Sequence, residues 1–181
     1  MSTDFLDFDV GDMYFDRPLP EQVEQLIDEA AENYGEEKAE LFLLRAYLIA
    51  PEHLSTMVAL YRYYYYQHRL GDALCVVNNA IRISARELHL IDDWRRVTPL
   101  EVAAGAYRSV GLVRFYLLAL KAAGFVMVRM GDVDNGADAL RKVVEHDPKD
   151  RLMTKDLLEV ILSYTYANEN ENENVMRFAA G

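Results

Sequence analysis

Apolar residues recur with helical spacing along most of the chain, and the pattern itself repeats. Two segments carry the order small, large, small at offsets of four and then three residues: Ala39, Leu43 and Ala46, followed about 34 residues later by Ala73, Val77 and Ala80. These offsets place each triplet on one face of a helix, where small side chains let a neighbouring helix approach closely. A third copy, before Pro148, has Gly136, Leu140 and Val143 in the same slots. The pattern predicts an all-α fold of packed helices.

Short turns divide each copy into two helices. Gly35, Gly71 and Gly131 each separate two apolar-periodic segments, so each copy reads as a helix hairpin of about 34 residues. This spacing resembles the tetratricopeptide (TPR) family over roughly residues 20–150, although no Trp opens any repeat. The resemblance implies a solenoid of about three repeats, and a generic helical bundle is the alternative. We expect the repeats over about 20–53, 54–84 and 115–150.

The regular spacing is interrupted between the second and third copies by an insertion over about residues 85–113. Within it, Thr98, Pro99 and Glu101 form a helix start, with Thr as the N-cap and Glu completing a capping box. We therefore expect an inserted helix over about 99–110, which Gly111 ends or bends.

The two ends of the chain differ from the repeats. Thr154 can cap a C-terminal amphipathic helix over about 154–167, which a solenoid needs to cover its exposed end. The helical domain then covers about 20–167. Asn and Glu alternate after it, which predicts a polar linker and tail over 168–181. Residues 1–19 form an acidic-aromatic N-terminal segment, which could dock into a groove of this protein, bind a partner, or pack loosely on the first repeat.

Charge narrows the classes of function. The formal net charge is −11, which argues against a nucleic-acid partner because phosphate neutralisation needs clustered Lys and Arg. Acids dominate both ends, whereas residues 80–130 carry eight bases against four acids, a polarity that could orient a partner. The single Cys75, the absence of a signal-peptide pattern and the short apolar stretch over 115–128 lead us to expect a cytoplasmic protein that spans no membrane.

Catalytic and cofactor motifs are missing from the sequence. The four histidines lack metal-ligand spacing, and no phosphate-binding Gly-rich loop, dinucleotide fingerprint or nucleophile elbow occurs. The numerous acids on helical repeats read as a solvated face. We expect a non-catalytic protein with no cofactor and no metal.

A run of tyrosines supplies the candidate binding residues. Because consecutive helical residues point around the whole circumference, the five tyrosines between 61 and 66 cannot all be buried. By repeat register, Tyr61 and Tyr64 pack inward. The residues expected to line a concave groove come from two helices: Arg62, Tyr65 and Tyr66, then Lys121, Phe125 and Arg129. Tyr and Arg often anchor interfaces, although ordinary packing between helices is equally open for each tyrosine.

The insertion adds a second candidate group. Trp94 is followed by Arg95 and Arg96, so an exposed Trp flanked by charge would be an interface anchor. Alternatively, Trp94 could fill the gap where the inserted helix leaves the solenoid. A rival class of function, a small-molecule or metal-binding regulator, would use Trp94 together with His89.

Residues 54–105, with the tyrosine run, the Gly-Asp-Ala-Leu turn and the segment DDWRRVTP, resemble small TPR proteins encoded with nitrogen-fixation genes. This resemblance implies an accessory, chaperone-like factor or scaffold that associates with nitrogenase or with its maturation intermediates. Length, charge and repeat number are also similar to the acidic TPR chaperones of type III secretion. The insertion and the aromatic N-terminus depart from that second pattern.

Overall fold

The computed structural model describes residues 18–165, and every regular element in that range is helical. The N-terminal segment predicted over 1–19 and the tail predicted over 168–181 lie almost wholly outside the described residues. The elements, in chain order, are α1 (Glu21–Glu32), α2 (Glu37–Ile49), α3 (Leu54–Tyr66), α4 (Leu70–Leu88), the 3-10 turn η2 (Trp94–Arg96), α5 (Pro99–Arg108), α6 (Val110–Arg129) and α7 (Val133–His146). Residues 155–165 form a last helical segment.

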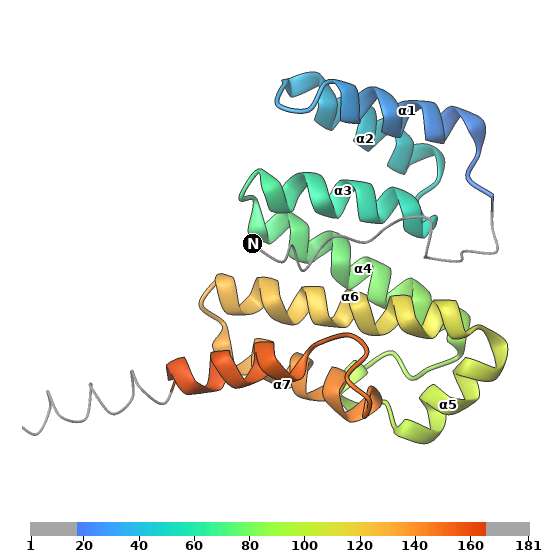
Figure 1. The fold of residues 1–181 in the computed structure, drawn as a ribbon. Coiled ribbons are helices and arrows are strands. Elements are labelled where there is room, and N and C mark those ends of the chain that lie inside the picture. The colour runs from blue at the N-terminus through green and yellow to red at the C-terminus, as the bar shows by residue number, and fades with distance from the viewer. Residues whose placement is uncertain (1–17, 166–181) are drawn as a thin grey trace, which may run out of the picture.

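The helices are arranged as hairpins stacked in chain order. α1 packs on α2, α3 on α4, and α6 on α7, while α2 contacts α3 and α4 contacts α6, so each hairpin lies on the next (Figure 1). η2 and α5 lie between the second and third hairpins in sequence and cover the end of the stack beside α6 and α7. The expectation of an all-α fold is confirmed.

Small residues set the contacts between neighbouring helices, as their spacing predicted. Ala39, Leu43 and Ala46 on α2 are buried, and so are their counterparts on α4, Ala73, Val77 and Ala80. On α6 and α7 the approach is closer still, because glycines face each other. A Cβ on Gly124 would lie 2.9 Å from the carbonyl oxygen of Gly136, and a Cβ on Gly136 would lie 2.7 Å from that of Gly124. The backbones of α6 and α7 therefore touch.

The inserted helix begins as expected and ends differently. The Thr98 hydroxyl accepts a hydrogen bond from the Glu101 amide at 3.3 Å, and the Glu101 carboxylate accepts one from the Thr98 amide at 2.8 Å. The helix ends at Arg108, and Gly111 lies inside α6 rather than ending α5. The reason is Ser109, which takes an extended conformation and accepts a hydrogen bond from the Leu112 amide at 3.1 Å, starting α6 there.

The last helical segment also begins with a different cap. Asp150, not Thr154, supplies the capping oxygen, which accepts hydrogen bonds from the amides of Thr154 at 2.8 Å and Lys155 at 3.2 Å. Thr154 is buried, and its hydroxyl faces the carbonyl of Leu152 instead. Ile161 is buried on the inner face of this segment.

Among the described residues, one helix, α6, is long and apolar enough to cross a membrane by length and composition. Most of its apolar window is buried inside the protein, between the second hairpin and α7. It has the character of the central helix of a folded domain.

Candidate functional site

The tyrosine run on α3 divides between the core and the surface. Tyr61, Tyr63 and Tyr64 are buried, Tyr65 is half-buried, and Tyr66 is exposed. Inward packing of Tyr61 and Tyr64 was predicted from the repeat register. Tyr63 is also buried, where its ring meets that of Tyr34 edge to face with centroids 6.1 Å apart. The outer part of the run is therefore Tyr65 and Tyr66.

Four of the predicted groove residues meet where α3 lies beside α6, and we call them the aromatic–arginine cluster: Tyr65, Tyr66, Phe125 and Arg129. Arg129 donates a hydrogen bond from Nη1 to the Tyr65 hydroxyl at 2.8 Å, and its guanidinium carbon lies 5.2 Å from the centre of the Tyr65 ring. The Tyr65 ring lies 6.3 Å from that of Phe125 and 5.5 Å from that of Tyr66. The cluster thus joins residues that are up to 64 positions apart in the sequence.

The other two predicted groove residues have different positions. Arg62 is half-buried on α3, one helical turn before Tyr65 and Tyr66, and therefore on their side of the helix. Lys121, by contrast, is buried, and its ammonium group donates hydrogen bonds to the carbonyl oxygens of Leu152 at 2.5 Å and Met153 at 3.2 Å. Lys121 does not line an open groove, because the loop after α7 folds over it. Burial lowers the pKa of Lys121, and Asp150 and Asp147 partly offset that effect.

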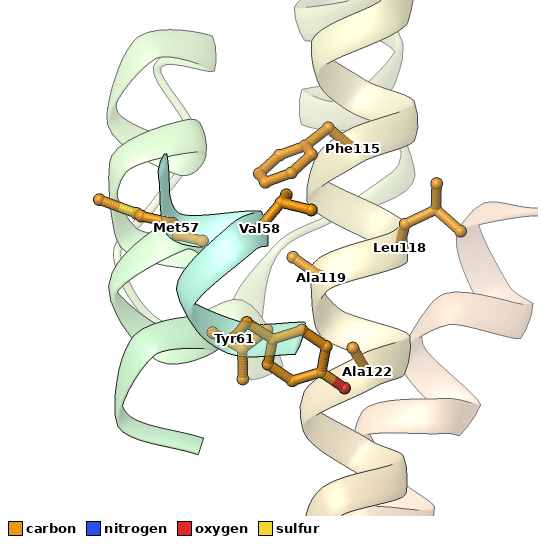
Figure 2. A pocket seen from close by; sticks show the side chains of 9 residues that line it. Met57, Val58, Tyr61, Phe115, Leu118, Ala119 and Ala122 are labelled. Carbon is orange, nitrogen blue, oxygen red and sulfur yellow. The ribbon is translucent and has the colours of Figure 1, made fainter. Parts of the chain in front are cut away.

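A narrow apolar cavity of about 30 Å³ lies beneath the cluster, between α3, α4 and α6 (Figure 2). Its walls include Met57, Val58, Phe115 and Tyr61. The Tyr61 ring stacks on that of Tyr65 with centroids 6.1 Å apart, so it connects the cavity wall to the cluster. A space of this size holds about one water molecule or one methyl group, far less than a drug-sized ligand needs.

Tyr61 carries a buried hydroxyl that has no hydrogen-bond partner among the described residues. Burial, together with the neighbouring Tyr65 and Tyr66, raises the pKa of Tyr61 strongly. A buried hydroxyl without a partner costs stability relative to one that is hydrogen-bonded.

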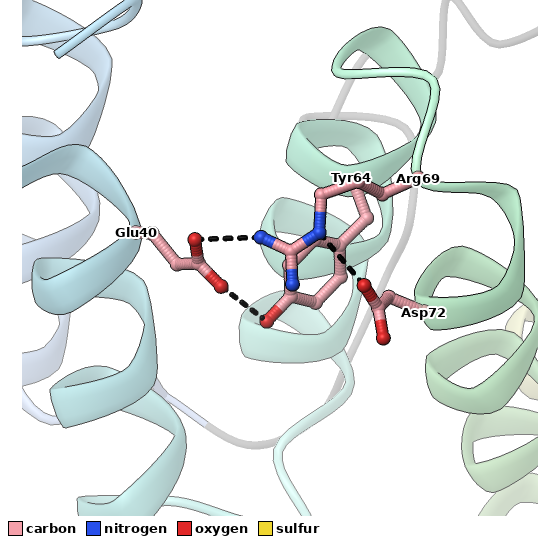
Figure 3. Close-up of polar contacts among 4 residues, drawn as sticks. All are labelled: Glu40, Tyr64, Arg69 and Asp72. Carbon is pink, nitrogen blue, oxygen red and sulfur yellow. Dashed lines mark hydrogen bonds and ion pairs between the residues drawn. The ribbon is translucent and has the colours of Figure 1, made fainter. Parts of the chain in front are cut away.

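A polar network, which we call the inter-hairpin clamp, ties the first two hairpins together (Figure 3). Arg69 donates from Nη1 to Glu40 at 2.7 Å and from Nε to Asp72 at 2.7 Å, and the Tyr64 hydroxyl donates to Glu40 at 3.1 Å. The guanidinium also lies 4.5 Å from the centre of the Tyr64 ring. Burial, then the hydrogen bond to Glu40, raises the pKa of Tyr64 to about 12.

The sequence analysis did not identify this clamp. The three-residue spacing of Arg69 and Asp72 could have suggested an ion pair between them. The pairing of Arg69 with Glu40 has no such local signal, because Glu40 lies on a different hairpin. The clamp is a structural feature, because its charged groups pair with one another across the two hairpins.

In the insertion, the Trp94 side chain packs against the hydrophobic core and is not fully exposed to solvent. It is half-buried, with the Arg95 guanidinium 4.2 Å from the ring centre. Arg95 also donates a hydrogen bond to Asn135 on α7 at 2.8 Å, while Arg96 is exposed. Of the two readings of Trp94, the structure favours the one in which it fills the gap beside the inserted helix. The contacts of Arg95 lead to α7, whereas those of the aromatic–arginine cluster join α3 and α6.

No group of three or more His, Cys, Asp and Glu side chains within residues 18–165 could hold a metal ion. His146, the last residue of α7, has its pKa lowered, chiefly by burial.

Comparison with known proteins gives one informative relative. The chain is 41% identical over 162 residues, which is 90% of both chains, to a protein of Azotobacter chroococcum mcd 1 described as an uncharacterized 19.8 kDa protein in the nifW 5′ region. No protein-family model matches the chain, and no solved structure matches it. The likeness to a protein encoded beside a nitrogen-fixation gene is thus confirmed at the level of relatedness. The chain belongs to the same family as this protein of the nifW 5′ region.

Proposed function

We propose that this protein is a non-catalytic, TPR-like binding factor that associates with another protein through the aromatic–arginine cluster. The stacked order of the hairpins supports a TPR-like arrangement, together with the small residues buried in register on α2 and α4. In such arrays the first helices of successive hairpins present their side chains along one face. The cluster residues lie on α3 and α6, the first helices of their hairpins.

The observation that carries this proposal is the contact between Arg129 and Tyr65. An exposed arginine ordinarily loses side-chain freedom when a partner binds it, and that loss weakens binding. Here the hydrogen bond and the ring beneath the guanidinium already hold Arg129 in one orientation. Tyr and Arg are also the residues that most often dominate binding energy when they are truncated. The cluster is therefore a preorganised anchor for a partner.

The charge around the cluster indicates the kind of surface it would bind. Residues 80–130, which include α6, carry a net positive charge within a strongly acidic chain. A partner surface with acidic groups around an apolar centre would complement it, and electrostatic complementarity favours orientation and speed of association. We expect neither nucleic acid nor membrane as the partner.

The partner we propose is nitrogenase or one of its maturation intermediates, which would make this protein an accessory or chaperone-like factor acting in the cytoplasm. Support comes from the location named for the relative, the nifW 5′ region, because nif genes serve nitrogen fixation. The described residues offer no metal-holding group, so handling of a metal cluster by this chain alone is not part of the proposal.

Affinity capture from native cells tests the proposal. A tagged full chain would be recovered from cells grown with and without nitrogen-fixing conditions, and the captured proteins identified by mass spectrometry. We expect nitrogenase subunits or maturation proteins to be enriched under fixing conditions. Failure to enrich any of them under those conditions would remove the nitrogenase assignment.

A further inference from the structure

Two helices present stripes of exposed apolar side chains on the surface of the described residues. The first, which we call the α2 stripe, consists of Leu41, Leu44 and Leu48 on α2, and Leu48 is 78% exposed. The second, which we call the α5 stripe, consists of Leu100, Ala104 and Tyr107 on α5, and Tyr107 is 95% exposed. In both helices the residues recur every three or four positions, so each set forms one continuous strip along the helix.

Each stripe lies opposite the face by which its helix joins the fold. The inner face of α2 is made of Ala39, Leu43 and Ala46, all buried, and the inner face of α5 is made of Val102 and Gly105, also buried. Neither stripe is therefore used to hold the hairpins together. The two stripes are also far apart: α2 belongs to the first hairpin, α5 lies at the other end of the stack, and α3 and α4 come between them (Figure 1).

Charge distinguishes the two ends. Residues 21–49, which form the α1–α2 hairpin, hold eight acids and two bases. Five of the acids lie on α1, which packs on α2, whereas both bases, Lys38 and Arg45, lie on α2 itself. Residues 94–108, which form η2 and α5, hold three bases and one acid. One end of the stack is thus acidic and the other basic, and each carries an exposed apolar strip of similar length.

We propose that copies of this chain associate head to tail, with the α2 stripe of one copy docking on the α5 stripe of the next. Pairing like with like would bring two acidic hairpins together, or two basic insertions, and like charges in contact are unfavourable. Pairing α2 with α5 buries the same kind of apolar surface and brings opposite charges together. The arrangement is heterologous, so each added copy leaves one stripe free at either end and the assembly can continue or close into a ring.

The size of the contact sets its strength. Each stripe is only two to three helical turns long, which places the interface well below the standard size of about 1,600 Å² for stable complexes. The association is therefore weak, dependent on concentration, and weakened by salt as the attraction between the two ends is screened. This inference does not depend on the proposed partner, since it uses neither α3 nor α6.

Sedimentation velocity of the full chain over a range of concentrations tests the head-to-tail contact, with two variants that each remove one half of it. Leu48→Gln alters the α2 stripe and Tyr107→Gln alters the α5 stripe, and both positions are so exposed that folding should not change. Val160→Gln, at an exposed apolar position of the last helical segment, is the matched control. We expect the parent and the control to form species beyond the dimer as concentration rises, and each stripe variant to associate at least tenfold more weakly.

Mixing the two stripe variants gives the sharpest outcome. Each retains one intact stripe, so an equimolar mixture should form a one-to-one dimer that grows no further. Monomers at every concentration would overturn the proposal, whatever else covers the stripes. Association of the parent chain that neither stripe variant weakens would also overturn the proposal, because that result requires a contact elsewhere on the surface.

Discussion

The Arg129 guanidinium donates a hydrogen bond to the Tyr65 hydroxyl at 2.8 Å and lies 5.2 Å from the centre of the same ring. One residue comes from the end of α6 and the other from the end of α3, so the contact crosses from the second hairpin to the third. It fixes an exposed cation on an aromatic platform that is itself supported from below by Tyr61. The contact between Arg129 and Tyr65 therefore both joins two hairpins and forms part of the proposed binding surface.

Two tyrosines of the same helix should respond oppositely to loss of their hydroxyls. Tyr61→Phe removes a buried hydroxyl that has no hydrogen-bond partner among the described residues, so stability should be unchanged or rise by up to about 1 kcal/mol. Tyr64→Phe removes the hydrogen bond to Glu40 and should lower the free energy of unfolding by about 1 kcal/mol. Urea unfolding followed by circular dichroism measures both. Equal destabilisation by the two changes would contradict the assigned contacts.

The glycines between α6 and α7 should be sensitive to a single added methyl group. Gly136→Ala places a Cβ 2.5 Å from a methyl of Val128 and 2.7 Å from a backbone oxygen, so it should destabilise the fold by about 1–3 kcal/mol. Gly71→Ala, in the first turn of α4 and with open space around it, is the control and should leave stability unchanged or raise it by up to about 1 kcal/mol. Thermal unfolding of the two variants checks this, and a neutral Gly136→Ala would contradict the close backbone contact.

Removing the inter-hairpin clamp should destabilise the fold only modestly, because its arginine is partly exposed. Arg69→Gln removes both ion pairs, and screening by water limits the expected destabilisation to about 1 kcal/mol or less. The loss should shrink further in high salt. Arg86→Gln breaks a 2.8 Å pair with Glu52, whose two side chains are more exposed than those of Arg69 and Glu40, and should leave the free energy of unfolding unchanged. Comparing the two variants in low and high salt measures the difference. Arg69→Gln that behaves like Arg86→Gln would show that the clamp contributes nothing.

Alkaline pH should unfold the protein through its buried tyrosines. Burial raises the pKa of Tyr61 and Tyr116 strongly, and that of Tyr64 to about 12. In the unfolded chain these groups ionise near pH 10, so the folded state binds more protons above that pH and loses stability as pH rises. The loss is up to about 1.4 kcal/mol per pH unit for each fully buried tyrosine. Below pH 10 these groups should have no effect.

Tyrosinate absorbance and circular dichroism, recorded together from about pH 9 to 12.5, measure whether the protein loses helicity as the pH rises through about 10–12. A fraction of the tyrosines should ionise only as helicity is lost. Full ionisation of every tyrosine while the helices persist would show that these hydroxyls are accessible, contrary to their burial.

Much of the helical arrangement follows from local sequence. Ala39 and Ala46 on α2, with Ala73 and Ala80 on α4, predicted close helix contacts because side-chain size alone decides how near two helices can lie. Thr98 and Glu101 predicted the start of α5 because a capping box needs only residues three apart. These features depend on neighbours in the chain.

Other features depend on contacts between distant segments and could not be predicted from spacing. Lys121 has a groove position by repeat register, yet the loop around Leu152 folds over it and accepts its hydrogen bonds. The partnership of Glu40 with Arg69 joins two hairpins and has no local signature. The end of α5 could not be predicted either. Ser109 caps the start of α6, so α5 ends at Arg108 and Gly111 lies within α6.

The central claim is that the aromatic–arginine cluster holds a partner protein, and capture by a folded variant of the cluster tests it most directly. The double variant Tyr66→Ala and Arg129→Ala removes the exposed ring and the cation. Tyr164→Ala, an exposed tyrosine of the last helical segment, is the control. Circular dichroism confirms that each variant is folded before use in capture from cells grown under nitrogen-fixing conditions. We predict that recovery of the partner falls at least tenfold for the cluster variant and is unchanged for the control. Full recovery by the folded cluster variant would contradict the account.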